Sequence, residues 1–208
     1  MKFAHTTIAV AGTHSTGKSS FLKEVEARLT AHGLRVGRVV DTASRARDAG
    51  FPILREHVYE GTLWIMAEGL RQEMEAALRF DVVLVDRPPL DALGYFLAAL
   101  EATGREPDEV RREELKLIAL AHQSRYHWFA ATILDESVPI GPNRDDDDAF
   151  RRLAGETIGK LVRANIARSP WLTMTNAASL VNEAVELTLQ RHQLQRPLSA
   201  SLRALEPK

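Results

Sequence analysis

The sequence contains no cysteine, which excludes disulfide bonds, zinc sites with cysteine ligands and thiol nucleophiles. Absence of cysteine suits the reducing cytosol, and we expect a cytoplasmic protein. The chain also has no long apolar run. Its uninterrupted hydrophobic stretches are far shorter than the roughly 20 residues that a membrane helix needs, so we predict no membrane partner. Residues 1–5 run directly into a strand-like segment, and we expect no signal peptide.

An excess of charge of either sign is missing too. The 27 Lys and Arg residues nearly balance the 28 Asp and Glu residues, for a formal net charge of −1. No global basic field therefore recruits nucleic acid, which we do not expect as a partner. The composition of 45% hydrophobic and 26% charged residues is that of an ordinary globular protein, and 208 residues suit one α/β domain.

Apolar strand-like segments alternate with amphipathic helical ones along the chain. Such alternation predicts a three-layer α/β fold with a five-stranded parallel sheet. We assign residues 1–192 to this single domain and 193–208 to a C-terminal tail that frays or docks on a partner. The polar stretch within 136–149 predicts an exposed loop, and residues 44–61 read as irregular. The predicted strands are 6–11, 34–40, 81–86, 128–134 and 171–175, and the predicted helices are 18–32, 63–80, 91–103, 108–122, 147–167 and 178–192.

Polar residues follow four of the predicted strands at or near the point where each ends. They are Gly12, Asp41, Asp86 and Asp135. Because ligands of open parallel sheets lie beyond the carboxyl ends of the strands, we expect these four positions to share one functional rim.

The segment between the first strand and the first helix matches G-x-x-x-x-G-K-[ST], in the strand-to-helix context that this motif requires. Its glycines let successive backbone N–H groups turn inward around phosphate, and the helix N-terminus adds partial positive charge. Lys18 can reach the β- and γ-phosphates, and the Ser19 hydroxyl can bind Mg²⁺. We therefore predict ATP and Mg²⁺ as cofactors. The predicted nucleotide contacts are Gly12, Thr13, His14 (as a backbone spacer), Ser15, Thr16, Gly17, Lys18, Ser19 and Ser20.

Two strand-end acids are candidates for the metal shell or for activating a nucleophile. Asp86 ends one hydrophobic run and Asp135, followed by Glu136, ends another. Position favours Asp86, which we predict as a catalytic residue and a metal ligand together with Ser19. It is followed by Arg87 rather than Glu, which favours transfer chemistry over water activation. For Asp135, anchoring a loop and serving the active site remain equal alternatives.

A third acid, Asp41, follows the second predicted strand. A carboxylate there can take a proton from an attacking hydroxyl, or it can cap a helix. We therefore keep Asp41 beside Asp86 as a candidate base.

Arginines in and after the predicted loop can supply positive charge over the γ-phosphate. We expect residues 137–152 to form a lid in which Arg144 is catalytic and Arg151 contacts the nucleotide. Arg151 and Arg152 are expected on the outer face of the helix, where an ordinary solvated role is the alternative. The four aspartates at 145–148 are predicted to cap this helix rather than to bind metal.

These residues resemble a known family. The Gly12–Ser19 motif, the Asp86-Arg87-Pro88 turn and Asp135-x-x-x-Pro139 followed by Arg144 are similar to the ribosylnicotinamide-kinase-like AAA domains, relatives of the deoxynucleoside and thymidylate kinases. The resemblance implies a P-loop kinase core with a parallel five-stranded sheet and a mobile lid that carries arginine. It also implies that Asp86 and Arg87 stand beside the acceptor and the phosphates. The family's second-strand acid is often Glu in an E-x-x-R-like setting, whereas here it is Asp41, with Arg45 one residue further on than in that pattern.

We therefore expect an ATP-dependent small-molecule kinase that acts on a nucleoside, a nucleotide or a related hydroxyl compound. The alternative is a regulatory nucleotide-binding ATPase or switch whose output is a protein contact. ATP is preferred over GTP from the resemblance and because no N-K-x-D segment is present. The identity of the acceptor and the formation of a homodimer stay open. Candidates for reading the acceptor's base are Trp64, Arg71, Gln72 and Tyr95.

Overall fold

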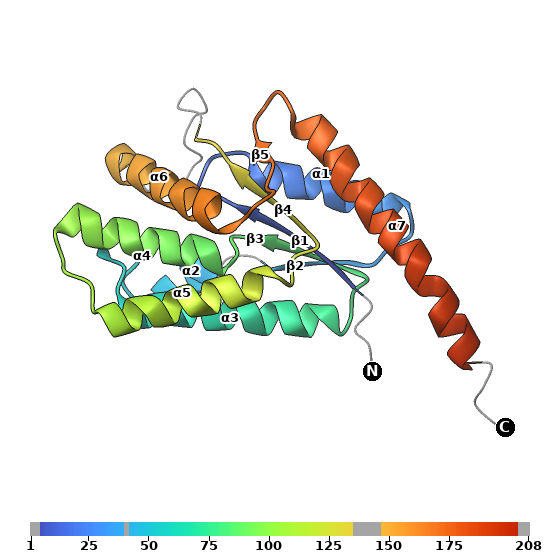
Figure 1. The fold of residues 1–208 in the computed structure, drawn as a ribbon, viewed down its shortest axis with the longest axis horizontal. Coiled ribbons are helices and arrows are strands. Elements are labelled where there is room, and N and C mark those ends of the chain that lie inside the picture. The colour runs from blue at the N-terminus through green and yellow to red at the C-terminus, as the bar shows by residue number, and fades with distance from the viewer. Residues whose placement is uncertain (1–4, 40–41, 135–146, 204–208) are drawn as a thin grey trace.

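The computed structural model describes residues 5–39, 42–134 and 147–203. Strands and helices alternate along the chain, and the helices lie on both sides of one sheet (Figure 1). The strands are β1 (Thr6–Ala11), β2 (Val36–Val39), β3 (Val82–Asp86), β4 (Trp128–Thr132) and β5 (Trp171–Leu172). The helices are α1 (Lys18–Ala31), α2 (Thr42–Asp48), α3 (Tyr59–Ala77), α4 (Pro89–Thr103), α5 (Glu109–Gln123), α6 (Asp148–Asn165) and α7 (Ala177–Arg203), with a 3₁₀ turn η1 (Leu54–Glu56).

All four strand pairings in the sheet are parallel, and the strand order is β2-β3-β1-β4-β5. β1 lies at the centre, and all six of its residues are buried, as expected for a β-branched and apolar strand without alternation. β3 pairs directly with β1, in a register that sets Val10 against Asp86. The end of β3 therefore lies beside the start of the glycine-rich loop.

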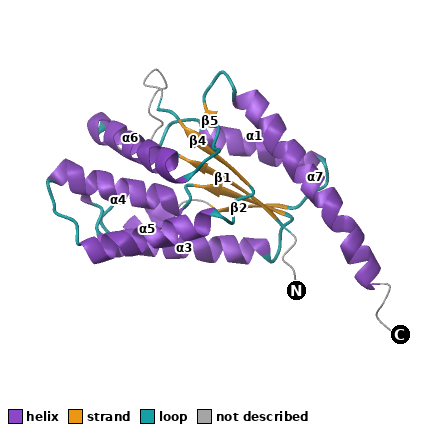
Figure 2. Cartoon of the chain, viewed as in Figure 1, coloured by secondary structure: helices purple, strands orange, loops and turns teal. Residues whose placement is uncertain are grey.

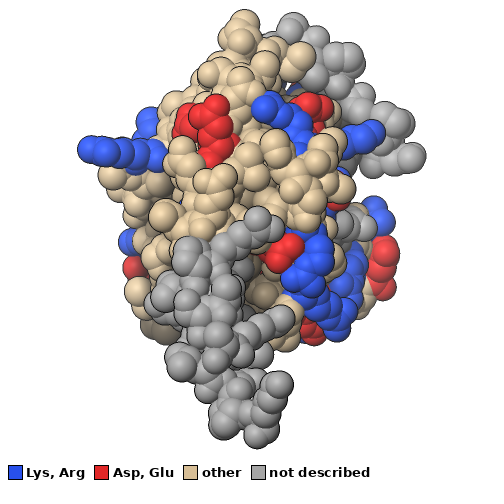
Figure 3. Space-filling model, turned by 90° about the vertical axis from the view of Figure 1, so that its right-hand side faces the viewer, with Lys and Arg blue, Asp and Glu red and all other residues tan. Residues whose placement is uncertain are grey.

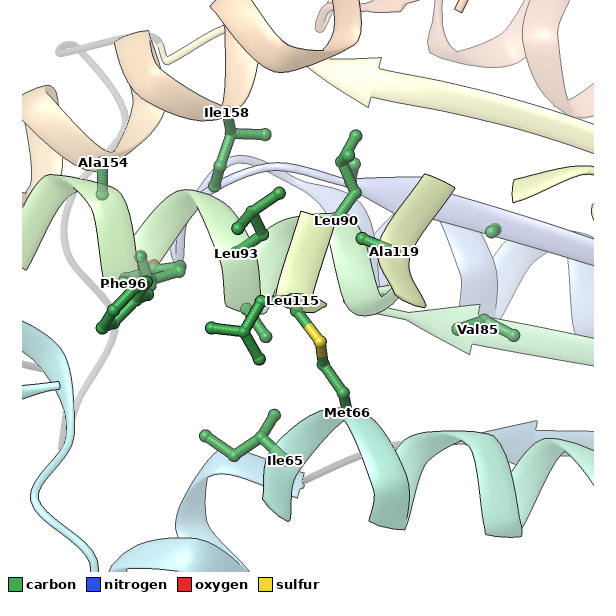
Figure 4. Close-up of a cluster of buried hydrophobic side chains, with 14 of the residues drawn as sticks. Ile65, Met66, Val85, Leu90, Leu93, Phe96, Leu115, Ala119, Ala154 and Ile158 are labelled. Atoms are coloured by element: carbon green, nitrogen blue, oxygen red, sulfur yellow. The ribbon is translucent and has the colours of Figure 1, made fainter. Parts of the chain in front are cut away.

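Helices cover both faces of the sheet (Figure 2). Two hydrophobic cores, one on each face, fix them to it. On one face, α1 and α7 pack on the sheet through side chains such as Leu22 and Val185. On the other face, α3, α4, α5 and α6 form a larger core. Figure 4 shows part of it: Ile65, Met66, Val85, Leu90, Leu93, Phe96, Leu115, Ala119, Ala154 and Ile158.

Several helix boundaries follow from capping chemistry in the sequence. Asp108 accepts hydrogen bonds from the first backbone N–H groups of α5, and Asp147 accepts one from Phe150 N at 2.9 Å at the start of α6. α4 has Pro89 in its first turn, and Gly104 follows its end at φ 65°. The prediction that the acidic segment caps a helix is confirmed for Asp147.

The five predicted strands and six predicted helices are all present, with shorter strand ends than expected. Two local predictions are wrong. The stretch 44–61 contains most of α2 as well as η1, and α2 buries only Thr42 and Ala46, so its sequence carries no amphipathic period. The last helix does not end near residue 192 but continues to Arg203.

Basic and acidic side chains both appear on the face of the molecule drawn in Figure 3, and several groups of opposite charge lie next to one another. In the described parts of the chain, no helix is both long enough and apolar enough to cross a membrane. Residues 135–146 lie outside the described residues, and they include most of the predicted lid, 137–152.

Candidate functional site

The loop between β1 and α1 depends on glycines at two positions. Gly12 has φ 137° and Gly17 has φ 86°, which side chains of L-residues rarely tolerate. A Cβ atom on Gly12 would also come within 1.9 Å of Thr132 Oγ1 at the end of β4. Thr132 Oγ1 in turn donates to Thr16 Oγ1 at 2.8 Å, so the end of β4 holds the loop at Thr16.

Lys18 begins α1, and its side chain is buried within the loop rather than extended into solvent. Its Nζ donates to the Thr13 carbonyl and lies 3.3 Å from Thr16 Oγ1. A buried ammonium surrounded by loop oxygens is positioned to exchange these partners for phosphate oxygens. The loop therefore has the shape and charge of a phosphate-binding turn.

Ser19, in the first turn of α1, and Asp86, the last residue of β3, contact one another directly. Ser19 Oγ donates a 2.7 Å hydrogen bond to Asp86 Oδ2. The second carboxylate oxygen, Asp86 Oδ1, is buried and has no hydrogen-bond partner. A hydroxyl and a carboxylate at this spacing are the hard oxygen donors that Mg²⁺ prefers.

Asp91, in the first turn of α4, anchors the start of the loop. Both of its carboxylate oxygens lie 3.0 Å from Gly12 N and accept its hydrogen. Asp91 is only 2% exposed, and this burial raises its pKa to about 7 against the opposing charges of Lys18 and Arg87. The carboxyl group therefore joins α4 to the loop in a site that is shielded from water.

Arg87 follows Asp86 and turns its side chain toward α4. Its Nη1 donates to Tyr95 Oη at 3.2 Å, and its guanidinium carbon lies 5.4 Å from the centre of the Tyr95 ring. The cation is thus held beside Asp86 and Asp91 by an aromatic residue. Arg87 therefore lies at the carboxyl ends of the strands, as the sequence predicts.

Arg151 reaches the loop from α6. Its Nε donates to the His14 carbonyl at 3.4 Å and its Nη2 to the Ser15 carbonyl at 3.2 Å. The prediction of an outer helix face is wrong for Arg151, which is 4% exposed, because the helix turns this side chain inward to the loop carbonyls. Arg152 beside it is exposed, as predicted.

A pocket of about 440 Å³ opens beside Ser19 and Asp86. Its walls come from α2, η1, α3, the end of β3 and the start of α4, so it lies on one side of the phosphate loop. The lining residues are His14, Ser19, Arg38, Thr42, Ala43, Ser44, Arg47, Ile53, Leu54, His57, Ile65, Met66, Gly69, Asp86, Arg87, Pro88, Pro89, Asp91, Ala92 and Tyr95.

His57 is the most buried titratable side chain on the η1 side of this pocket, at 3% exposure. Its Nδ1 lies 3.0 Å from the Leu54 carbonyl, and its ring centre lies 6.0 Å from that of Tyr95. Burial, with a smaller contribution from Arg87 and Arg105, lowers the pKa of His57 to about 4. The imidazole is therefore neutral near pH 7.

Backbone strain gathers at the same place. Among the described residues, three that are not glycine have positive φ: Ser15 at 55°, Leu54 at 60° and Arg87 at 72°. Ser15 belongs to the phosphate loop, and the other two line the pocket. Such strain persists only where the surrounding structure enforces it, and it concentrates at functional sites.

The structure brings most of the predicted site residues together. The loop residues from Gly12 to Ser19, Asp86, Arg87 and Arg151 all lie around the loop and the pocket mouth. Ser20 lies exposed in the first turn of α1. Of the residues predicted to read the acceptor's base, Tyr95 lines the pocket and Trp64, Arg71 and Gln72 do not. Asp41, Asp135, Glu136 and Arg144 lie outside the described residues.

Sequence reasoning missed three residues of the site: Asp91, Thr132 and His57. Asp91 and Thr132 each stand in or beside a predicted element, where an ordinary helix start or strand end explains them. The partner of Asp91 is Gly12 N, 79 residues away, and the partner of Thr132 is Thr16 Oγ1, 116 residues away, and no local pattern reveals such contacts. The acid two residues after Asp86-Arg87-Pro88-Pro89 is the one sequence signal that could have pointed to Asp91.

The glycine-rich loop, the central β1 and the adjacent β3 define a P-loop domain. The chain belongs to the AAA domain family, whose model matches residues 7–169. The resemblance to kinase-like AAA domains drawn from the sequence is confirmed at the level of this family.

Two solved structures share the fold. The NadR protein in complex with NAD and AMP-PNP superimposes with a TM-score of 0.64 at 12% identity, and NadR in complex with NR with a TM-score of 0.63 at 13% identity. Each match covers 89% of this chain, but only 50% and 52% of the respective NadR chains. This chain therefore spans about half the length of those proteins. A search of curated proteins found no match.

Proposed function

We propose that this protein is an ATP- and Mg²⁺-dependent phosphotransferase, a kinase of a nucleoside, a nucleotide or a related small hydroxyl compound. One observation carries the proposal: the hydrogen bond between Ser19 and Asp86 joins the phosphate loop to the mouth of the 440 Å³ pocket. A transferred phosphoryl group must stand between its donor and its acceptor. The Ser19–Asp86 pair lies at that boundary.

The donor side of the proposal has ATP on the loop from Gly12 to Ser19, with Lys18 on the β- and γ-phosphates. Mg²⁺ fits the pair of Ser19 Oγ and Asp86, because Asp86 Oδ1 is buried without a partner and carboxylate oxygen is a suitable ligand. When bound, the metal supplies charge that neutralises the phosphates. The fold that this chain shares with NadR bound to AMP-PNP supports a nucleotide at the loop.

The acceptor side is the pocket next to that pair. Its volume falls within the roughly 300–1,000 Å³ of small-molecule sites, and its walls combine apolar side chains with a few polar ones. NadR has also been solved with NR, which supports a ribosyl compound as one acceptor to test. In the proposal, Asp86 or Asp41 takes the proton of the attacking hydroxyl.

Positive charge for the transition state comes from Lys18 and Arg87, both fixed by contacts in the folded protein. We propose that Arg144, in the predicted lid, adds charge when ATP is bound, and that Arg151 contributes near the nucleotide. A cytoplasmic location, where ATP is abundant, completes the proposal.

A coupled assay that follows ADP release tests this function. The enzyme is offered ATP and Mg²⁺ with a panel of nucleosides, nucleotides and ribosylnicotinamide, and the rate is compared with that in the absence of any acceptor. We expect one class of acceptor to raise ADP release at least about tenfold and to appear as a phosphorylated product by mass spectrometry.

A regulatory ATPase would give the opposite pattern. ADP release would then be the same with and without every acceptor, and no phosphorylated product would form. That result would replace the kinase proposal by the switch whose output is a protein contact. Lys23→Ala, an exposed lysine on the same helix as Lys18, serves as the matched control for variants of the loop.

A further inference from the structure

The protonation of His57 follows from its neighbour. The Leu54 carbonyl, 3.0 Å from Nδ1, can only accept a hydrogen bond, so Nδ1 carries the proton. A neutral imidazole with a proton on Nδ1 has a lone pair on Nε2. His57 Nε2 is buried and has no hydrogen-bond partner in the structure. A residue of the pocket wall thus carries a hydrogen-bond acceptor, Nε2, that has no hydrogen-bond donor.

The protein holds this ring in place from two directions. Leu54 adopts a strained φ of 60°, and its carbonyl orients the ring. Arg105 fixes the backbone, since its Nη2 donates to the His57 carbonyl at 2.8 Å while its Nε donates to Thr103 Oγ1 at 2.7 Å. Strain and bracing of this kind are features of a site that must present one atom in a defined direction.

Buried polar atoms in native proteins nearly always have a partner, and an exception calls for a ligand or a water. His57 lines the pocket together with Tyr95, so a molecule that fills the pocket is the candidate source of the missing donor. We propose that His57 is a specificity-determining residue of the acceptor pocket, whose Nε2 accepts a hydrogen bond from an amide N–H, amino or hydroxyl group of the acceptor. The inference rests on the proposed function, which makes this pocket the acceptor site.

The proposed contact predicts which small molecules the pocket rejects. A compound with a carboxylate in place of the amide brings a lone pair and a negative charge to Nε2 and is excluded. A compound with hydrogen in place of the amino group leaves Nε2 unpaired. Because a buried acceptor without its donor is costly, we expect each such change to weaken binding by about 10- to 100-fold.

Matched pairs of probes test this prediction by calorimetry, with AMP-PNP and Mg²⁺ present so that binding is measured apart from turnover. The pairs are ribosylnicotinamide with ribosylnicotinate, adenosine with purine riboside, and cytidine with its analogue that lacks the 4-amino group. Deoxy derivatives of the nucleoside that binds best test the ribose hydroxyls in the same way.

Three variants separate recognition from folding. In His57→Asn the amide nitrogen can keep the hydrogen bond to Leu54 while the Nε2 acceptor is lost. His57→Gln places an amide oxygen near the former Nε2, and His57→Phe removes both polar atoms. We expect His57→Asn to bind the probe with the hydrogen-bond donor as weakly as the wild type binds the probe without it. The variant should then bind the two members of each pair with equal affinity. His57→Gln is expected to keep part of the discrimination.

Failure of this inference is distinguishable from failure of the proposed function. If the wild type binds both members of every pair and the deoxy derivatives equally well, or if His57→Asn and His57→Gln weaken both members equally, His57 has only a structural role and the inference is wrong. If no probe binds, it is wrong as well. If a probe binds with the expected discrimination but is never phosphorylated, the inference stands and the kinase function fails.

Discussion

Asp91 accepts the backbone N–H of Gly12 on both of its carboxylate oxygens, each at 3.0 Å. The start of α4 is thereby tied to the first residue of the phosphate loop. Asp91 also lines the pocket, so this one carboxyl group borders both proposed substrate sites.

The raised pKa of Asp91 predicts a pH dependence of stability. Its pKa of about 7 in the folded protein lies above the ordinary carboxyl value, so the folded state binds a proton more tightly than the unfolded state. The stability from this group is fully present below about pH 4 and is lost as pH rises through about 7. We expect urea unfolding to show that the wild type loses stability relative to Asp91→Asn between pH 5 and pH 8, because asparagine does not titrate. A constant difference across this range would contradict the assignment.

Replacing Lys18 by alanine should abolish useful ATP binding and turnover. The ammonium contacts loop oxygens rather than the hydrophobic core, so the fold should persist with little change in circular dichroism. We expect a loss of about 100-fold or more in turnover, the scale of a group that stabilises developing phosphate charge. Lys23→Ala is the control, and ATP affinity equal to wild type in Lys18→Ala would overturn the P-loop assignment.

Asp86 and Arg87 should matter for turnover more than for nucleotide affinity. Asp86→Asn keeps the shape of the Ser19 contact but removes its charge, and Arg87→Ala removes the cation held by Tyr95. Both should lower turnover by roughly 10²-fold or more. Turnover and ATP binding are measured beside Glu136→Gln, with Arg112→Ala as the control, because Arg112 is a partly exposed arginine on α5 that does not line the pocket. A loss confined to Glu136→Gln would favour the regulatory ATPase.

Arg151 should support the phosphate loop from α6. Its guanidinium donates to two loop carbonyls in a buried setting, so Arg151→Ala leaves these groups without their partner. We expect a loss of about 1–3 kcal/mol in unfolding free energy together with weaker ATP binding. The neighbouring exposed Arg152→Ala should change stability by no more than about 0.5 kcal/mol. Equal effects of the two changes would contradict the bracing role.

Much of the fold could be predicted because its signals are local. The apolar runs of β1 and β3 and the helical spacing in α1 and α3 set the alternation of elements, and the loop motif sets the phosphate site. α2 was missed because seven residues with only two buried side chains give no period.

The site was only partly predictable for a related reason. Asp86 stands at a strand end, where topology brings it to the rim. By contrast, the inward turn of Arg151 depends on how α6 packs, and the partner of Asp91 is a backbone group 79 residues away in the chain. The place of His57 in the pocket wall depends on how its ring packs beside Tyr95. Contacts of that kind become visible only when the chain is folded.

The central position of β1 makes the phosphate loop more rigidly held than the wall of the pocket. β1 has hydrogen-bonded strands on both sides, so the loop that follows it is locked by two ladders at once. Much of the wall of the proposed acceptor pocket comes instead from α2, η1 and α3, which follow the edge strand β2 in the sequence and lie outside these ladders. In the proposed function, this wall is the part of the site that selects the acceptor. Substitutions on it, for example at Leu54, are therefore expected to change the choice of acceptor more than the binding of ATP, which makes the wall the place to begin engineering.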